Sequence, residues 1–144
     1  MLSNTSKYAI RAVIYLAVKS NGESKIGIKQ ISKDLDIPTP FLGKILQSLA
    51  KHKMLSSTKG PHGGFGLGKN PYEISLMDIV EVIDGLDSFN SCVLGLKSCT
   101  DDDQHCPIHR SYGAIREQLK TLFETENIGD LADHIKESDF SLAL

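Results

Sequence analysis

The sequence predicts a mainly α-helical fold with one small β-hairpin, and three observations lead to this fold class. Apolar residues recur at helical spacing, first in residues 5–18. Three glycines and one proline in residues 59–64 predict a tight reversal between two short strands. Residues 107–125 predict a long helix with heptad spacing. The 144 residues, 40% hydrophobic and 24% charged, suffice for one globular domain, with or without an appendage, and exclude a disordered chain.

The first helix is expected at residues 5–18, with Asn4 or Thr5 as its cap. Residues 25–28 predict a small strand, and residues 29–35 predict a short helix. That helix must end before Pro38, since the residue preceding a proline is pushed out of the helical region.

The next helix is expected to have Thr39 as its N-cap and Pro40 at its first position, and to run to about Lys53. Its inward-facing residues are expected to be Phe41, Leu42, Ile45, Leu46 and Leu49. Two short helices joined by a tight turn, the second of them basic, are typical of a helix-turn-helix. Residues 54–58 and 65–67 then predict the two strands of the hairpin.

A hairpin directly after a helix-turn-helix is expected to be a wing. Its glycines let the backbone approach a partner closely. Lys59, Gly60 and His62 lie at its tip, where they could contact a partner. An ordinary hairpin is the alternative interpretation.

The second half of the chain is expected to hold a helix from Ser75 to about Asp84. Ser75 and Asp78 form a capping box, and Gly85 ends the helix. Residues 86–106 show no periodicity. A long helix opened by Pro107 and a short helix at residues 128–137 complete the chain.

The long helix carries a heptad seam, because its apolar residues are spaced four, three, four and three apart. Such a short seam also fits packing within one chain. We favour a dimerisation helix, since a small duplex-reading domain gains affinity and site length from two-fold symmetry. The expected interface consists of Ile108, Tyr112, Ile115, Leu119, Leu122 and Phe123.

The charges divide the chain into two halves. Residues 1–70 hold eleven Lys or Arg and three acids, whereas residues 71–144 hold five bases and fifteen acids. A basic half is the expected footprint of a nucleic-acid partner. We therefore expect a winged helix-turn-helix DNA-binding domain at 1–70, and a cysteine loop (86–106) with a dimerisation helix within 71–144. Solvated faces that segregate by chance are the alternative.

All three cysteines, Cys92, Cys99 and Cys106, fall in one fifteen-residue window. Thiolates from one loop are good ligands for soft metals. The gaps are wider than those of usual zinc sites and suit an iron–sulfur cluster, which needs a fourth ligand. His109 is the expected fourth ligand, because it lies three residues after Cys106 on the same helical face. Zinc, a metal-free thiol switch and three structural cysteines remain alternatives.

Two sequence runs resemble a known family. The run TSKYAIRAVIYLA (5–17), the run KGPHGGFGLGK (59–69) and three cysteines before a long helix are similar to the Rrf-type winged-helix regulators, which include IscR, NsrR, RirA and CymR. The resemblance covers nearly the whole chain. It implies a homodimer that binds palindromic promoter DNA, and in many members an iron–sulfur cluster whose state alters that binding.

The resemblance also assigns residues. Cys92, Cys99 and Cys106 match the three cysteine ligands, and His109 matches the histidine that completes a two-iron cluster in the IscR branch, which favours 2Fe-2S over 4Fe-4S. In the NsrR branch a partner's acidic residue ligates the cluster, but Lys7 stands at that position here. The cysteine gaps are six residues instead of about five, and Lys59 and His62 replace an arginine and a glycine of the usual wing.

We expect a dimeric DNA-binding regulator, more a repressor than an activator. Phosphate contacts are expected from the lysines of the basic half, and base contacts from the first turns of the second helix of the pair. Lys59 is expected in the minor groove. The candidate DNA-binding residues are Lys7, Thr39, Pro40, Phe41, Lys44, Gln47, Lys51, Lys53, Lys59, Gly60 and His62.

Other classes of protein fit less well. The sequence has no nucleophile–base pattern, no phosphate-cradling loop and no paired acids, so we expect no enzyme. No apolar run is long enough for a membrane span, and no signal peptide is recognisable, so we expect a cytoplasmic protein. The remaining alternatives are a DNA-binding regulator that uses zinc or bare thiols, and a cluster carrier or partner-binding protein that does not bind DNA.

Overall fold

The computed structural model describes residues 2–19, 24–96 and 106–143. The helices are α1 (Asn4–Lys19), α2 (Ile28–Leu35), α3 (Thr39–Lys51), α4 (Leu76–Asp84), α5 (Asp87–Asn90), α6 (His109–Thr125) and α7 (Ile128–Lys136), with a 3-10 turn η1 (Pro71–Glu73). The antiparallel strands β1 (Leu55–Thr58) and β2 (Gly64–Leu67) form the one sheet of the described residues. The mainly helical fold class with a hairpin wing is confirmed.

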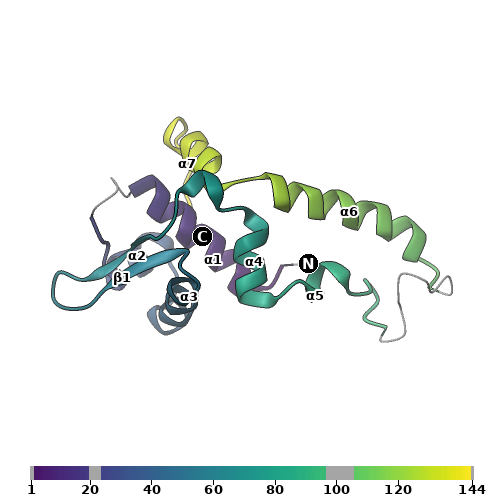
Figure 1. Cartoon of the computed structure of the whole chain (residues 1–144), viewed down its shortest axis with the longest axis horizontal. Coiled ribbons are helices and arrows are strands. Elements are labelled where there is room, and N and C mark those ends of the chain that lie inside the picture. The colour runs from purple at the N-terminus through teal and green to yellow at the C-terminus, as the bar shows by residue number, and fades with distance from the viewer. Residues whose placement is uncertain (1, 20–23, 97–105, 144) are drawn as a thin grey trace.

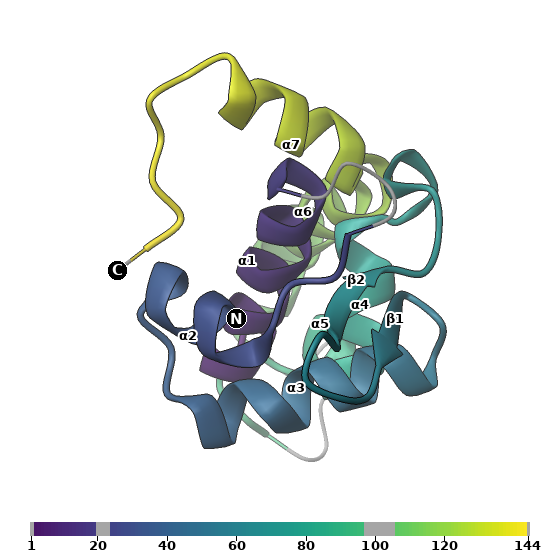
Figure 2. The ribbon, with the colours of Figure 1, turned by 90° about the vertical axis from the view of Figure 1, so that its left-hand side faces the viewer.

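Helix α1 is the centre of the molecule. It packs against α7 on one side and against α2, α3 and α4 on the others (Figures 1 and 2). Ala9, Ala12, Val13 and Leu16 of α1 are completely buried, because apolar residues occupy most of its circumference. The core continues beyond residue 70 through Ile74, Ile79 and Ile128, so the expected division of the chain at residue 70 crosses one continuous core.

Helix α6 lies outside this body. It extends away from α1 and packs chiefly against α4 (Figure 1). A second apolar cluster of Met77, Val80, Phe89 and Phe123 holds α4, α5 and α6 together. The ring centroids of Phe89 and Phe123 lie 5.3 Å apart and the ring planes are tilted by 60°, a favourable arrangement for two aromatic rings.

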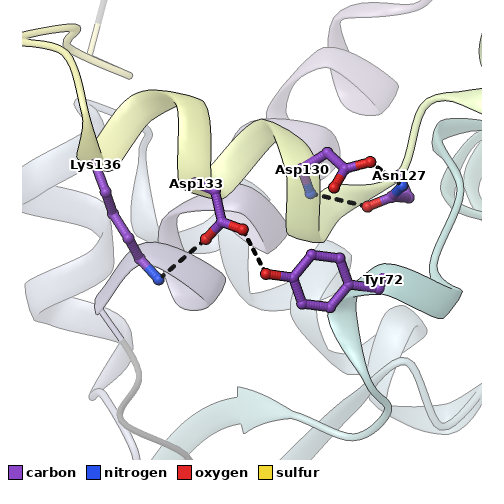
Figure 3. Close-up of polar contacts among 5 residues, drawn as sticks. All are labelled: Tyr72, Asn127, Asp130, Asp133 and Lys136. Atoms are coloured by element: carbon purple, nitrogen blue, oxygen red, sulfur yellow. Dashed lines mark hydrogen bonds and ion pairs between the residues drawn. The ribbon is translucent and has the colours of Figure 1, made fainter.

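Helix α7 is fixed to η1 by a tyrosine (Figure 3). The hydroxyl of Tyr72 donates to Asp133, and this hydrogen bond raises the pKa of Tyr72. Asp133 also pairs with Lys136 at 3.7 Å. The ring of Tyr72 lies so close to Gly129 that a Cβ there would come within 2.3 Å of it. The side chain of Asn127 caps α7 by accepting from the amide of Asp130 at 2.8 Å.

Several local predictions were wrong. Ser3 caps α1 instead of Asn4 or Thr5, because its hydroxyl accepts from the Ser6 amide at 3.0 Å. Thr39 is the first residue of α3 and not its cap, since its hydroxyl donates to Ser32.

The predicted elements also differ at their edges. The strand expected at 25–28 is reduced to one bridge between Ile26 and Phe65. Helix α3 ends at Lys51, because Lys53 adopts a left-handed φ of 63°. The aperiodic segment contains the short helix α5, and α6 begins at His109 instead of Pro107. No helix within the described residues is long and apolar enough to cross a membrane.

Candidate nucleic-acid interface and cysteine loop

Helix α3 turns one side inward and presents the other to solvent. Leu42, Leu46 and Leu49 are completely buried against the core. Phe41 is 64% exposed, although an apolar ring of this size is usually buried. The other exposed residues on this side of α3 are Thr39 and Pro40 in its first turn, followed by Lys44, Gln47 and Lys51.

The turn between α2 and α3 sets the angle of α3. Asp36 adopts the left-handed conformation at the end of α2, and Ile37 is buried directly after it. The hydroxyl of Ser32 donates to the carbonyl of Ile37 at 2.6 Å and accepts from Thr39 at 3.0 Å. These two bonds close the turn, so α2 fixes where the first turn of α3 begins.

A hydrogen bond also joins α1 to α2. The Tyr15 hydroxyl donates to Asp34 at 2.5 Å, and Gln30 donates to the same carboxylate at 2.8 Å. Burial, together with this bond to a carboxylate, raises the pKa of Tyr15, and the bond from Tyr15 lowers the pKa of Asp34. Sequence reasoning missed this pair, because the two residues lie nineteen positions apart and neither belongs to a motif.

The hairpin turns at Lys59–Gly63, between the paired residues Thr58 and Gly64. Gly60 has a φ of +105°, a conformation that favours glycine. At Gly63 a Cβ would meet the Thr58 carbonyl oxygen at 2.1 Å, so this position also requires glycine. The tip residues Lys59, Gly60 and His62 are exposed, as a wing that contacts a partner requires.

The start of α1 lies beside α3. A hollow of about 460 Å³ separates them, lined mainly by Asn4, Thr5 and Tyr8 of α1, by Phe41, Lys44 and Ser48 of α3, and by Ile83 at the end of α4. Lys7, Lys44, Lys51, Lys53 and Lys59 are all exposed. None of the hollow's lining residues is acidic, and Lys44 is among them, so the hollow carries a positive side chain of the kind that attracts a phosphate.

Two of the three cysteines belong to the described part of the chain. Cys92 is half-buried and Cys106 is 9% exposed. The amide of His109 donates to the Cys106 carbonyl at 3.2 Å, so these two residues lie within one turn at the start of α6. Cys99 lies outside the described residues. Within the described residues no three potential metal ligands lie together.

The residue types still suit a soft metal. Thiolate sulfur and imidazole nitrogen are both ligands of iron–sulfur clusters. The backbone hydrogen bond between His109 and Cys106 keeps these two residues within one turn of the chain, a spacing at which both can serve one metal. Cys92, Cys106 and His109 therefore fit an iron–sulfur cluster by their chemistry and by their positions along the chain.

The apolar residues of α6 divide between the chain's own core and solvent. Phe123 is buried against Phe89, and Leu119 is half-buried against the same cluster. Tyr112 is half-buried. Ile108, Ile115 and Leu122, which are spaced by seven residues, are 39%, 60% and 47% exposed. A row of exposed aliphatic side chains remains along α6 after the intramolecular contacts are made.

Known proteins resemble this chain over nearly its full length. The family model Rrf2, described as an iron-dependent transcriptional regulator, matches residues 2–134. A protein of Aquifex aeolicus, named as an HTH-type transcriptional regulator, is 33% identical and covers 91% of this chain and 90% of its own length. The IscR regulator of Pectobacterium atrosepticum is 25% identical over 92% of this chain and 79% of its own.

Solved structures show the same fold. CymR, the global cysteine regulator of B. subtilis, superposes with a TM-score of 0.77 at 25% identity, over 93% of this chain and 97% of its own. IscR of T. potens gives a TM-score of 0.76 at 20% identity, over 98% and 92%. These proteins are transcriptional regulators and not enzymes.

Proposed function

Because the chain belongs to the Rrf2 family of transcriptional regulators, we propose that it represses transcription by binding palindromic promoter DNA as a homodimer. The observation that carries this proposal is the outer surface of α3, where a 64% exposed Phe41 adjoins exposed Lys44 and Gln47. Exposure of a large apolar ring beside hydrogen-bonding side chains suits a groove that offers both methyl groups and polar base edges.

Helix α3 would lie in the major groove. Lys44 has the chemistry to donate to guanine, Gln47 to form two hydrogen bonds with adenine, and Phe41 to contact a thymine methyl. Thr39 and Pro40 begin the helix and are both exposed, so the first turn of α3 would face the groove. Lys7, Lys51 and Lys53 would contact phosphates, which give affinity without reading sequence.

The wing would reach the adjacent minor groove. Lys59, Gly60 and His62 are exposed at its tip, and Gly60 and Gly63 let the backbone come close to the sugar–phosphate surface. A lysine lacks the planar fork of arginine, so Lys59 would act as a positive charge and not as a bidentate reader.

The exposed row Ile108, Ile115 and Leu122 supports the homodimer. A helix that extends from the body with an aliphatic row on its surface can bury that row against a second copy. The expected interface also includes Tyr112 and Leu119. Phe123, which the sequence also assigned to it, is instead buried against Phe89 within the chain. Two reading helices related by two-fold symmetry match a palindromic operator.

We further propose that Cys92, Cys99, Cys106 and His109 hold an iron–sulfur cluster, with 2Fe-2S favoured. When bound, such a cluster supplies redox and ligand-exchange chemistry to the loop. The protein's part is to hold Cys106 and His109 at the start of α6 and Cys92 after α5. The loop they bracket connects α5 to α6, so a cluster bound there would affect how α6 is held to the rest of the chain.

DNA binding is tested by footprinting the DNA upstream of the chain's own gene, followed by titration with the protected fragment. We expect one protected palindrome and an affinity that falls steeply between about 50 and 200 mM salt. Equal binding to unrelated DNA would contradict operator recognition, and no binding would favour a cluster carrier or a partner-binding protein.

The cofactor is tested separately on protein purified without oxygen. We expect iron and sulfide in the preparation, visible absorption typical of an iron–sulfur cluster, and loss of both in Cys99→Ala. Zinc in metal analysis, or no metal at all with intact thiols, would contradict the cluster and leave a regulator that uses zinc or bare thiols. Unchanged operator affinity in Cys99→Ala would contradict the role of the loop in regulation.

A further inference from the structure

Asp84 joins the end of α4 to the start of α1. Its carboxylate accepts from the Ser3 hydroxyl at 2.8 and 2.6 Å and from the Ser6 hydroxyl at 2.7 Å. We call Ser3, Ser6 and Asp84 the α1–α4 clasp. Hydrogen bonds from a hydroxyl to an ionised carboxylate are short and about twice as strong as neutral ones, so the clasp is a specific connection between segments 78 to 81 positions apart.

The surroundings make this connection costly to break. Ser6 is completely buried, so its hydroxyl would be left without a partner in the protein interior if Asp84 were removed. Ser3 accepts from the Ser6 amide while it donates to Asp84, and it thereby caps α1. The negative charge of Asp84 also lies at the positive end of α1.

An apolar contact beside the clasp also joins the start of α1 to α4. Leu2 and Ile10 pack against the second apolar cluster, which contains Val80 of α4, Phe89 of α5 and Phe123 of α6. The first turn of α1 is therefore held to α4, α5 and α6 by both polar and apolar contacts. In addition, Ile83 lines the hollow beside Phe41 of α3, so the clasp is also near the reading helix.

The clasp lies where the chain leaves the helix-turn-helix body. Gly85 comes directly after it with a φ of +75°, and α5 and Cys92 come next. A glycine at this position gives a turn that does not itself fix the direction of α4 relative to α5. The hydrogen bonds of Asp84, by contrast, do restrain the direction of α4 relative to α1.

We propose that Asp84 is a positioning residue that sets the spacing of the two reading helices in the dimer. This inference rests on the proposed function, because spacing has meaning only for a dimer on a palindrome. Through the clasp, α1 and the helices that pack on it take a fixed direction relative to α4 and the dimerisation helix α6. If this direction is fixed in both protomers, the two copies of α3 lie at one fixed separation, and the dimer prefers operators whose half-sites have the same separation.

The experiment compares three operators, namely the footprinted palindrome and versions with one base pair added or removed at its centre. Wild type should prefer the natural spacing. Asp84→Ala should reduce that preference by roughly 2- to 30-fold, the range found when residues that couple two sites are changed. Ser6→Ala should cause a smaller loss in the same direction, and Asp84→Glu, which keeps the charge, should restore part of the preference. Binding to a single half-site should not change, whereas general destabilisation would weaken all sites alike.

Asp87→Ala is the matched control, since it removes an exposed acid three residues later and outside the clasp. It should keep the spacing preference of the wild type. A second readout needs no DNA. Amide hydrogen exchange in Asp84→Ala should accelerate together in residues 3–9 and 81–86, and not in α7.

An unchanged spacing preference in Asp84→Ala, or exchange rates equal to wild type in both segments, would overturn the inference. Failure of the proposed function looks different. In that case wild type itself would bind no operator or show no spacing preference, so the clasp could not set a spacing, while hydrogen exchange would still decide whether it restrains α1.

Discussion

Tyr15 and Asp34 form a hydrogen bond that holds the helix-turn-helix to the central helix. We expect Tyr15→Phe to lower the free energy of unfolding by about 1 kcal/mol near neutral pH, the usual contribution of one such bond. The pKa of Asp34 is lowered in the folded state, chiefly by the hydrogen bond from Tyr15. The ionised carboxylate therefore stabilises the folded state above its unfolded pKa of about 4, and this stabilisation is lost as the pH falls through the folded pKa. Urea unfolding at about pH 7 and about pH 3 should therefore show a gap between wild type and variant that narrows in acid. An equal gap at both pH values would contradict an ionised partner.

Lys44 is the residue on which the base-reading hypothesis depends most. We expect Lys44→Ala to lower operator affinity by about 1–3 kcal/mol and to relax specificity at one base pair. The measurement is a titration of operator variants at two salt concentrations. Lys136→Ala is the control, since Lys136 lies on α7 and pairs with Asp133, and it should bind as wild type does. A uniform loss across all sequences would instead indicate that Lys44 contacts a phosphate.

Single residues were the scale at which sequence reasoning was weakest. The sequence pattern predicts the apolar faces of α1 and α3, and the burial of Ala9, Val13 and Leu42 confirms them. It was wrong at Phe41, which it placed on the inward face of α3 and which is 64% exposed. The cap at Ser3 was missed because the neighbouring Asn4 and Thr5 are equally good cap residues by type. Thr39 was wrongly predicted as a cap because its hydroxyl bonds to the distant Ser32, which the local pattern does not show. The Tyr15–Asp34 bond and the α1–α4 clasp depend on how distant segments meet, which no local pattern encodes.

At the scale of the element, α6 carries the proposed dimer. We expect Ile115→Asp to convert the dimer to monomer at micromolar concentration, because each protomer would lose the burial of an isoleucine, worth about 1.5–3 kcal/mol, and would gain a buried charge. Light scattering after size exclusion measures the change. Thr121→Asp is the control on the same helix, since Thr121 is exposed and lies outside the aliphatic row. A monomeric wild type, or a dimeric Ile115→Asp, would contradict the assignment.

Helix α4 supports both the body and α6, so its start matters for the whole chain. Ser75 and Asp78 form a complete capping box, with bonds of 3.0 and 2.9 Å. Ser75→Ala should lower the free energy of unfolding by about 1 kcal/mol, as measured by urea or thermal unfolding. Ser57→Ala, at an exposed position on β1, should change it by less than about 0.5 kcal/mol. Equal effects of the two changes would show that the cap contributes nothing.

Elements with strong local signals were predicted well. The glycine-rich reversal, the capping box and the long helix all occur where the sequence placed them, within a few residues. Helix α5 was missed because four residues are too few to show a helical period, and it is held by Phe89 packing on Phe123. The strand at 25–28 became a single bridge because α2 begins at Ile28.

For the molecule as a whole, the sequence predicted two halves of opposite charge, and the structure adds that one core joins them. Ile74, Ile79 and Ile128 belong to the acidic half, yet they pack with α1 of the basic half. Charge pattern reflects the partners of a surface, whereas the core reflects apolar contacts, so the two need not divide the chain at the same residue. Helix α4 contributes Ile79 to this core and Val80 to the cluster that holds α6, so α4 is the element that links α6 to the rest of the molecule.

The central claim is that the basic half binds promoter DNA and that the cysteine loop changes the affinity of this binding. The most direct measurement is operator affinity of the dimer at about 100 mM salt, with the cluster-loaded protein and the cluster-free protein compared in the same titration. The account predicts specific binding that weakens steeply with salt, and a difference between the two forms of at least about fivefold. Loaded and cluster-free protein that bind the operator equally, or that both fail to bind it, would contradict the account.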